Sequence, residues 1–262
     1  MYRMLEEAGA AERDLRCVRL WLSGADAMPA DLAARFKGYG ATAELPVVGA
    51  VGQAMFAEGY GMVETGGGVA AKVSPPFLGF GLGDSMGMAL PGYRFRVVDE
   101  HDQPVRRGQV GELWVKGPGV LTGYRGDAEA TAATLTDDGW LRTGDLARQG
   151  PMGLVFFAGR KKDVIKHGGY SVYAVEVEQA LEEHPDVVEA AVVGLPDPKM
   201  GEVPVAVLRL ADGRRLNQKA MKTWVAERLS DYKQPLRYAA VRELPRTGTK
   251  KVQRAELVAL FD

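Results

Sequence analysis

The segment between Leu141 and Glu178 constrains the fold most, because it joins two parts of the chain that have different sequence patterns. It contains a short apolar run from Leu154 to Ala158, and after Arg160 it continues with lysines, a pair of glycines and an acidic amphipathic run. A strand that leads into a cluster of cations and glycines is typical of a joint between two domains. We therefore predict a large domain over residues 1–160 and a smaller one over residues 161–262.

Composition excludes several classes of protein. The 262 residues carry a formal net charge of -1, which gives no general surface for nucleic acid. Cys17 is the single cysteine, so an intramolecular disulfide and a cysteine-built metal site are excluded. A lone cysteine also suits a reducing compartment, and we expect a cytoplasmic protein. No apolar run approaches the ~20 residues of a transmembrane helix.

The first part of the chain has the pattern of a parallel α/β unit. Residues 2–14 are predicted to form an amphipathic helix, and Leu15–Leu22 alternates apolar and cationic residues, as a strand does. A tight turn that includes Ala25 and Asp26 follows, and Pro29–Lys37 is predicted to be a helix with proline in its first turn. The turn therefore lies at the carboxyl end of a strand, where α/β proteins bind ligands.

From Pro91 onward the pattern changes to short alternating strands. Tyr93–Asp99 and Val110–Lys116 are predicted to pair across a polar hairpin loop. Ala128–Thr134 is predicted to be a short helix. We expect this stretch to form a small antiparallel subdomain that resembles a β-barrel.

The part after Arg160 is predicted to be an α+β domain of about 100 residues, a normal domain size. It contains one short strand, three longer strands and three helices. The predicted strands are Asp163–Lys166, Val187–Val193, Val203–Leu210 and Tyr238–Val241, and the predicted helices are Ser171–Glu182, Leu216–Leu229 and Arg254–Phe261.

The cluster Gly59-Tyr60-Gly61 is a candidate nucleotide-binding turn. An aromatic ring between two glycines is able to lie flat against a planar base while the backbone approaches closely. Glu64 adds a carboxylate of the kind that Mg²⁺ prefers. A glycine-rich turn without a ligand is the more common explanation of such a cluster, and an isolated glutamate is more often a surface acid.

Three further side chains have the chemistry of a nucleotide site. Asp145 follows Thr-Gly in a predicted turn, where its carboxylate is able to accept two hydrogen bonds from a ribose diol or to cap the turn. Arg160 is a candidate for the same ribose or a phosphate, or else for a weak surface ion pair. Lys251, in the cationic loop Leu244–Arg254, is a candidate for neutralising the charges of a phosphate and a carboxylate. The alternative is that this loop is a solvent-exposed basic loop without a ligand.

Four motifs in order, GYGMVE, RTGDLA, GRKKDVIKHGGYSVYAVEVE and LPRTGTKK, closely resemble the adenylate-forming superfamily. Acyl-CoA synthetases, aryl-CoA ligases, firefly luciferase and peptide-synthetase adenylation domains belong to it. The resemblance implies an α/β fold: the C-terminal portion of the large AMP-binding domain, then a mobile α+β domain. It also implies two steps. A carboxylate attacks the α-phosphate of Mg-ATP to give an acyl-adenylate and pyrophosphate, and a thiol, usually that of CoA, then displaces AMP.

The resemblance also assigns roles to residues. Tyr60 would stack on the adenine of ATP or AMP. Glu64 would bind Mg²⁺, and Asp145 would hold the ribose hydroxyls with Arg160 beside it. The residues expected near the adenine are Ala25, Asp26, Gly59 and Gly61.

The second domain would serve both steps. Lys162 would lie at the hinge about which this domain rotates. Lys251 would bridge the acyl carboxylate and the α-phosphate in the first step, and Gly169 would line the pantetheine tunnel of CoA in the second. Lys250 replaces the glycine that usually precedes the catalytic lysine, so both lysines are candidates, and their spacing from Pro245 favours Lys251.

Several departures from the family pattern affect these expectations. Val63 stands where the family usually has threonine, and Ala174-Val175 lies where a proline is usual. The phosphate loop of the type TSGTTGxPK does not occur in this sequence. We therefore expect a C-terminal fragment, a truncation or one piece of a split enzyme, inactive alone in ATP–pyrophosphate exchange. It would form a homodimer or associate with a missing N-terminal half.

The substrate is the least determined feature. The small residues Gly66–Gly68 after Glu64 leave room for an acyl chain, and we expect a fatty-acyl-CoA synthetase. Two other enzymes fit the motifs: an aryl-CoA ligase, or an adenylating enzyme that loads a carrier protein. A non-catalytic module that binds nucleotide or CoA is a further alternative, supported by Val63 and the missing phosphate loop.

Overall fold

The computed structural model describes residues 1–24, 28–75, 85–248 and 251–261. The chain divides into two compact units, Met1–Phe157 and Ala158–Asp262. The division lies within strand β10 (Val155–Arg160). Ala25, Asp26 and Lys250, which were named above, lie outside the described residues. None of the helices in the described ranges is long and apolar enough to cross a bilayer.

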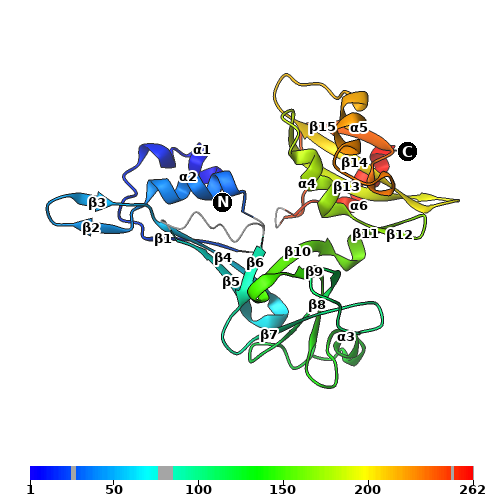
Figure 1. The fold of residues 1–262 in the computed structure, drawn as a ribbon, viewed down its shortest axis with the longest axis horizontal. Helices are drawn as coiled ribbons and strands as arrows, with labels where there is room; N and C mark the ends of the chain where they lie inside the picture. Colours follow the sequence, from blue (N-terminus) through cyan, green and yellow to red (C-terminus); the bar gives the residue numbers. More distant parts are fainter. Residues whose placement is uncertain (25–27, 76–84, 249–250, 262) are drawn as a thin grey trace. The chain divides into compact units, whose positions relative to one another are not determined.

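The first unit is built on an eight-stranded sheet with the order β1-β4-β5-β6-β10-β9-β8-β7 (Figure 1). β1 and β4 are parallel, whereas β4–β5, β5–β6 and the pairs among β7, β8 and β9 are antiparallel. Every strand from β4 to β10 contributes to one apolar cluster that includes Val69, Leu113 and Val155. The sheet therefore wraps around this core. The bounds are β1 Leu20–Gly24, β4 Met55–Met62, β5 Gly67–Ser74, β6 Ser85–Ala89, β7 Arg94–Val98, β8 Val110–Lys116 and β9 Leu141–Gln149.

Two short helices, α1 (Tyr2–Glu7) and α2 (Ala30–Tyr39), pack against the β1–β4 end of the sheet. The ring of Tyr2 lies 4.7 Å from that of Phe36 and 5.4 Å from that of Phe56. The predicted helix over residues 2–14 is too long, because Gly9 adopts a left-handed conformation with φ of 82° and the chain continues as a separate 3-10 turn. The predicted strand Leu15–Leu22 begins only at Leu20, after a turn.

The segment that follows α2 forms a hairpin and then a strand. The hairpin pairs β2 (Ala43–Leu45) with β3 (Gly49–Val51), and β4 follows beside β1. The predicted strand–turn–helix unit is therefore completed by a parallel strand, as an α/β unit requires.

The antiparallel strands of the first unit agree with the sequence pattern. β7 and β8 lie within or at the predicted ranges, and α3 (Ala128–Thr134) has the predicted bounds. Asp127 caps α3, since its carboxylate accepts a hydrogen bond of 2.9 Å from the amide of Ala130.

The second unit is a five-stranded sheet with apolar clusters on both faces. Alternate residues of β13 and β14 point to opposite faces: Val192 and Ala206 belong to the cluster under α4 and α5, and Val193 and Val205 belong to the cluster under α6. The bounds are β11 Val164–His167, β12 Tyr170–Tyr173, α4 Ala174–Glu182, β13 Val187–Asp197, β14 Gly201–Leu210, α5 Gln218–Ala226, β15 Arg237–Val241 and α6 Arg254–Val258.

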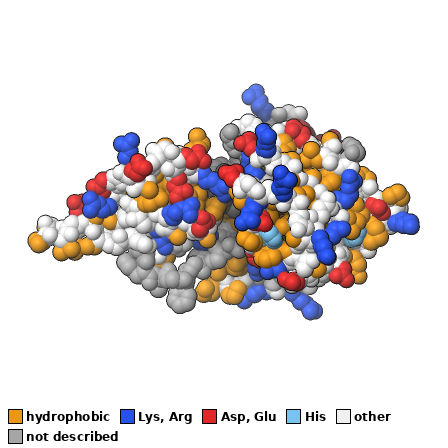
Figure 2. All heavy atoms as spheres, turned by 90° about the horizontal axis from the view of Figure 1, so that it is seen from above, with side chains coloured by type: hydrophobic (Ala, Val, Ile, Leu, Met, Phe, Trp, Pro, Cys, Tyr) orange, Lys and Arg blue, Asp and Glu red, His pale blue; other side chains and the backbone are white. Residues whose placement is uncertain are grey.

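One predicted helix of the second unit is partly wrong. The sequence predicts a helix from Ser171, but Tyr170–Tyr173 is strand β12, and α4 starts at Ala174. Val172 pairs with Ile165 of β11 and is fully buried, so tertiary pairing outweighs the helical pattern. Acidic and basic side chains are interspersed on the face shown in Figure 2, as expected for a chain of net charge -1.

Candidate functional site

Tyr60 and Asp145, 85 positions apart in the chain, are joined by a hydrogen bond. The hydroxyl of Tyr60 on β4 donates to Oδ2 of Asp145 on β9 at 2.6 Å. Four strand-to-strand steps separate β4 from β9 in the sheet, which would place them about 19 Å apart if the sheet were flat. The wrapping of the sheet therefore brings together two residues that the sequence predicts for one nucleotide.

Asp145 is 2% exposed, and the backbone before it is held by β8. The hydroxyl of Thr143 donates to the carbonyl of Leu113 at 2.6 Å and accepts from the amide of Asp145 at 3.1 Å. The amide of Gly144 donates to Oε1 of Glu112 at 3.1 Å. The predicted Thr-Gly-Asp turn is thus wrong, because these residues lie within strand β9, although Gly144 has a left-handed φ of 69°.

Glu112 lies next to the candidate site, and it was not predicted from the sequence. Glu112 is 6% exposed and lies at an irregularity in the β8–β9 register. A side-chain carboxylate thus replaces a backbone acceptor beside Asp145. The signal was an acidic residue inside the otherwise apolar run VGELWVK, since buried acids are rare unless they are hydrogen-bonded.

The two glycines beside Tyr60 have different reasons to be glycine. Both lie in strand β4, so the predicted turn at Gly59–Gly61 is also wrong. A Cβ on Gly61 would lie 2.0 Å from the carbonyl oxygen of Gly67, so the β4–β5 irregularity requires glycine there. A Cβ on Gly59 would meet only ordinary contacts at 3.9 and 4.0 Å. The fold therefore does not require glycine at the exposed position 59.

Glu64 lies in a 3-10 turn (Val63–Thr65) directly after β4. Its Oε1 accepts a hydrogen bond of 3.0 Å from the hydroxyl of Tyr124, which the sequence reasoning did not single out. Burial, and the hydrogen bond to Glu64, raise the pKa of Tyr124, so that it stays a neutral donor. Val63, where the family pattern has threonine, is 93% exposed.

The carboxylate of Glu64 fits one kind of metal site. Within the described ranges, no group of three or more His, Cys, Asp or Glu side chains is placed to hold a metal ion. A closed protein cage is therefore not formed there. A single carboxylate suits Mg²⁺, which keeps water ligands and binds phosphate oxygens of a nucleotide.

Gly169 and Lys162 occupy exposed positions in the second unit. Gly168 and Gly169 form the two-residue turn between β11 and β12, with φ of 57° and 84°. These angles are those of a type I′ turn, which requires positive φ at both positions, so the fold accounts for this glycine pair. Lys162 lies in the 3-10 turn after β10, and Arg160 ends β10; both are exposed.

Lys251 lies at the base of a closed loop. The amide of Thr247 donates to the carbonyl of Lys251 at 2.8 Å, and the amide of Lys251 donates to Oγ1 of Thr247 at 3.2 Å. The bridge between Arg246 and Val252 closes the loop further. The side chain of Lys251 is exposed.

Arg254, three residues after Lys251, anchors this loop and was missed by the sequence reasoning. Its guanidinium donates to Glu178 of α4 at 2.6 and 3.1 Å and to the carbonyl of Val192 at 2.7 Å. It also lies 3.5 Å from Asp163, next to Lys162. Burial favours the neutral form of Arg254, but Glu178 outweighs this effect and the pKa of Arg254 is raised.

Comparisons with known proteins match both parts of the chain. Residues 1–125 match the family model of the AMP-binding enzyme, and residues 176–251 match that of the AMP-binding enzyme C-terminal domain. A feruloyl-CoA synthase from an Amycolatopsis species is 36% identical over 251 residues, which are 95% of this chain and 47% of that protein. An indoleacetate–CoA ligase from Aromatoleum aromaticum is 39% identical over 198 residues, which are 76% of this chain and 38% of that protein.

A solved structure shows the same fold. The o-succinylbenzoate CoA synthetase of Bacillus subtilis, in complex with its acyl-adenylate intermediate, has a TM-score of 0.78 and 30% identity. The match covers 98% of this chain and 49% of that one. The predicted mixed α/β fold class is thereby confirmed. The chain spans less than half the length of each of these three proteins.

Proposed function

Because this chain belongs to the adenylate-forming superfamily, we propose that it takes part in the ATP-dependent activation of a carboxylic acid and its transfer to CoA. The observation that carries the proposal is the hydrogen bond between Tyr60 and Asp145. It joins the motif proposed for adenine to the motif proposed for ribose.

The nucleoside part of ATP would be held by β4 and β9. Asp145 is already buried, so its hydrogen bonds to ribose hydroxyls would be charge-assisted and little weakened by water. The hydroxyl of Tyr60 orients that carboxylate, and its ring offers a face to the adenine. Gly59 leaves space that the fold itself does not need. Arg160 would lie beside the ribose.

The phosphates would be bound with Mg²⁺ at Glu64. When bound, Mg²⁺ supplies positive charge to the phosphate oxygens and the pyrophosphate leaving group. Tyr124 holds Glu64 by donating to Oε1, which leaves the second carboxylate oxygen available. Val63 lacks the hydroxyl expected to contact a phosphate, so we expect weaker phosphate binding than in a threonine variant.

The reaction would use residues of the second unit in turn. An oxygen of the acid attacks the α-phosphorus, the bond to the bridging oxygen of the β-phosphate breaks, and pyrophosphate leaves. The sulfur of CoA then attacks the acyl carbon, AMP leaves, and the thiol proton passes to solvent. We propose that Lys251 neutralises charge in the first step, that Gly169 lines the path of CoA in the second, and that Lys162 is the hinge.

We propose an aromatic acid as the substrate. The names of the relatives, feruloyl-CoA synthase and indoleacetate–CoA ligase, support this class over a fatty acid. The glycines that led us to expect a fatty acid have another explanation. Gly66 and Gly67 have φ of 65° and 142°, so the backbone after Glu64 requires them whatever the acid.

The test measures binding of two sulfamoyl analogues of an acyl-adenylate, one with a cinnamoyl group and one with a decanoyl group, by calorimetry on the 262-residue chain. We expect the cinnamoyl analogue to bind more tightly and Asp145→Asn to weaken both. Tighter binding of the decanoyl analogue would refute the aromatic substrate, and no binding of either would refute the nucleotide site. ATP–pyrophosphate exchange by this chain alone should be negligible, because its sequence contains no phosphate loop.

A further inference from the structure

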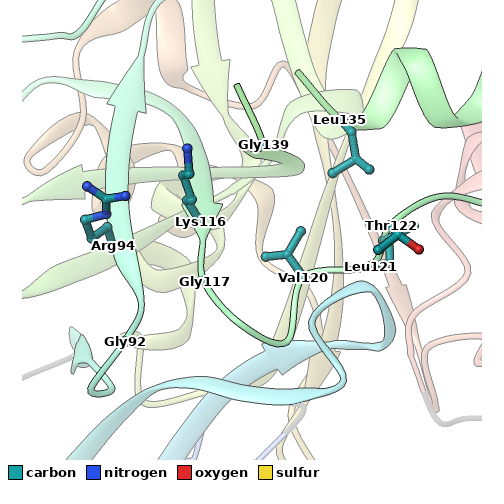
Figure 3. A pocket seen from close by; sticks show the side chains of 9 residues that line it. All are labelled: Gly92, Arg94, Lys116, Gly117, Val120, Leu121, Thr122, Leu135 and Gly139. Carbon is teal, nitrogen blue, oxygen red and sulfur yellow. The ribbon is translucent and has the colours of Figure 1, made fainter. Parts of the chain in front are cut away.

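A cavity of about 460 Å³ lies in the first unit, next to the residues proposed for the nucleotide but separate from them (Figure 3). Tyr60, Glu64 and Asp145 are not among the residues that line it. In Figure 3 the side chains of Arg94 and Lys116 extend from strands β7 and β8 on one side, and those of Val120 and Leu135 lie on the other. The cavity therefore has a cationic side and an apolar side.

The cationic side places two like charges directly opposite each other. Arg94 and Lys116 are a cross-strand pair in the β7–β8 register, so their side chains share one face of the sheet. Directly opposed like charges destabilise a strand pair. Among the residues that the structure describes, Arg94 has no hydrogen-bond or ion-pair partner, and Lys116 donates to the backbone carbonyl of Asp138.

The neighbouring charges do not cancel this pair. The hydroxyl of Thr136, and less strongly the charges of Lys116 and Arg96, lower the pKa of Asp138, so Asp138 is ionised at neutral pH. Arg96, which lies on the same face, adds a further cation and rests over the ring of Trp140 at 4.3 Å. The cations at this end of the sheet therefore outnumber the neighbouring acid, and an anion placed between Arg94 and Lys116 would relieve their repulsion.

The apolar side identifies the rest of the ligand. Val120, Leu121 and Leu135 line it with apolar side chains, and Thr122 beside them adds one hydroxyl. Gly139, on the rim, has a left-handed φ of 80°, and a Cβ there would lie 3.7 Å from the stem of Lys116. An inorganic anion would leave this apolar side in contact with water, whereas an anion with an apolar body would cover it.

We propose that this cavity binds an organic carboxylate, with its carboxylate group between Arg94 and Lys116 and its apolar body against Val120, Leu121 and Leu135. This site is additional to the one proposed for the adenylate. The wall of the cavity is also tied to Glu64, since the amide of Leu121 donates to the carbonyl of Glu64 at 2.8 Å. A bound carboxylate therefore stabilises the segment that supports Glu64.

The test titrates the 262-residue chain with cinnamate, with neutral cinnamamide and with inorganic phosphate, and follows the methyl signals of Val120, Leu121 and Leu135 by NMR. The proposal requires saturable shifts of these signals with cinnamate and much smaller shifts with cinnamamide, which lacks the charge. It also requires phosphate, which lacks the apolar body, to bind more weakly. Equal responses to cinnamate and cinnamamide, or no shift of these methyl groups with cinnamate, would overturn it.

Variants of the cavity residues show whether cinnamate binds in this cavity or at another site on the chain. Arg94→Gln and Lys116→Gln should each weaken cinnamate binding about tenfold or more, the effect of losing a hydrogen bond to a charged group. Arg107→Gln, in the loop at the opposite end of β7 and β8, should leave binding unchanged, as should Asp145→Asn. Unchanged affinity in both cavity variants refutes the proposal without bearing on the nucleotide site.

Arg94→Glu gives a second, independent result. A glutamate opposite Lys116 would form a cross-strand ion pair and occupy the place of the ligand carboxylate. We expect this variant to lose cinnamate binding and to melt at a higher temperature than the native chain. A lower melting temperature would contradict the repulsion between Arg94 and Lys116 on which the proposal rests.

Discussion

Replacing Tyr60 by phenylalanine removes one hydroxyl and keeps the ring. In the native chain this hydroxyl donates to Oδ2 of Asp145 at 2.6 Å, and Asp145 is 2% exposed. Removing the donor leaves a buried carboxylate oxygen with one hydrogen bond fewer. A hydrogen bond to a charged group contributes about 1.5–3 kcal/mol, so the first unit should lose stability of this order.

The expected shift in melting temperature follows from the size of the unit. For a unit of this length each kcal/mol shifts the midpoint by about 2–4 °C, so Tyr60→Phe should lower it by about 3–12 °C. Calorimetry is the appropriate assay, because a chain with two compact units does not have to melt in a single transition. Only the transition of the first unit should move.

The affinity for AMP tests what the hydroxyl does for the site. Tyr60→Phe retains a ring for the adenine but no longer orients Asp145, and we expect AMP to bind about tenfold more weakly, a loss of about 1.4 kcal/mol. Tyr39→Phe is the matched control. The hydroxyl of Tyr39 also donates to a carboxylate, that of Glu6, at 3.2 Å, but on the surface of the same unit.

Two results would refute this reasoning. If Tyr60→Phe and Tyr39→Phe have the same small effect on melting, the Tyr60–Asp145 bond does not stabilise the wrapped sheet. If Tyr60→Phe lowers the melting temperature but leaves AMP affinity unchanged, the bond is structural and does not orient Asp145 for ribose.

Three further predictions concern single positions. Gly59→Ala should leave the melting temperature nearly unchanged but weaken AMP binding. Gly61→Ala should prevent correct folding of the first unit, because its Cβ would lie 2.0 Å from the carbonyl oxygen of Gly67. Circular dichroism and calorimetry distinguish the two variants, and equal effects on folding would contradict the prediction. Val63→Thr, at a position 93% exposed, should not change stability but should tighten ATP binding in a calorimetric titration; unchanged affinity would remove Val63 from the site. Burial raises the pKa of Tyr238 from 10.0 to about 12, so its contribution to stability is complete below pH 10 and is lost as the pH rises toward 12. Tyr238→Phe should remove this loss and, because its buried hydroxyl has no hydrogen-bond partner in the described part of the chain, raise stability by about 1–3 kcal/mol; a less stable variant would contradict this.

The sequence predicted the element types well where one face of a strand or helix is buried. β7, β8 and α3 agree with their predicted ranges, since alternation and a capping aspartate are local signals. The mixed α/β class followed from the same patterns. Ser171–Tyr173 was predicted to be helical because the acidic run after it is amphipathic, but its partner β11 lies across a two-glycine turn and makes it a strand.

The candidate site was predicted in its residues but not in its geometry. Tyr60 and Asp145 were both named for one nucleotide, yet the glycine-rich segments around them were predicted to be turns and are strands with local irregularities. Their contact depends on the curvature of a sheet of eight strands, which no local pattern encodes. Glu112, Tyr124 and Arg254 were missed for the same reason, because each acts through a partner distant in sequence.

The hinge role of Lys162 and the catalytic role of Lys251 stay predictions. Arg254 gives them a physical connection, because it holds the base of the Lys251 loop and lies 3.5 Å from Asp163, next to Lys162. Loss of this connection would alter the position of Lys251 without removing its charge.

We propose that Asp145 binds the ribose of an adenine nucleotide. Titration of AMP into the 262-residue chain and into Asp145→Asn, followed by calorimetry, tests it most directly. Asparagine has nearly the same size and still accepts from the hydroxyl of Tyr60, but it lacks the charge that strengthens hydrogen bonds from the ribose diol. We predict saturable AMP binding to the native chain and at least about tenfold weaker binding to the folded variant. Equal affinity of the two proteins for AMP would contradict the claim.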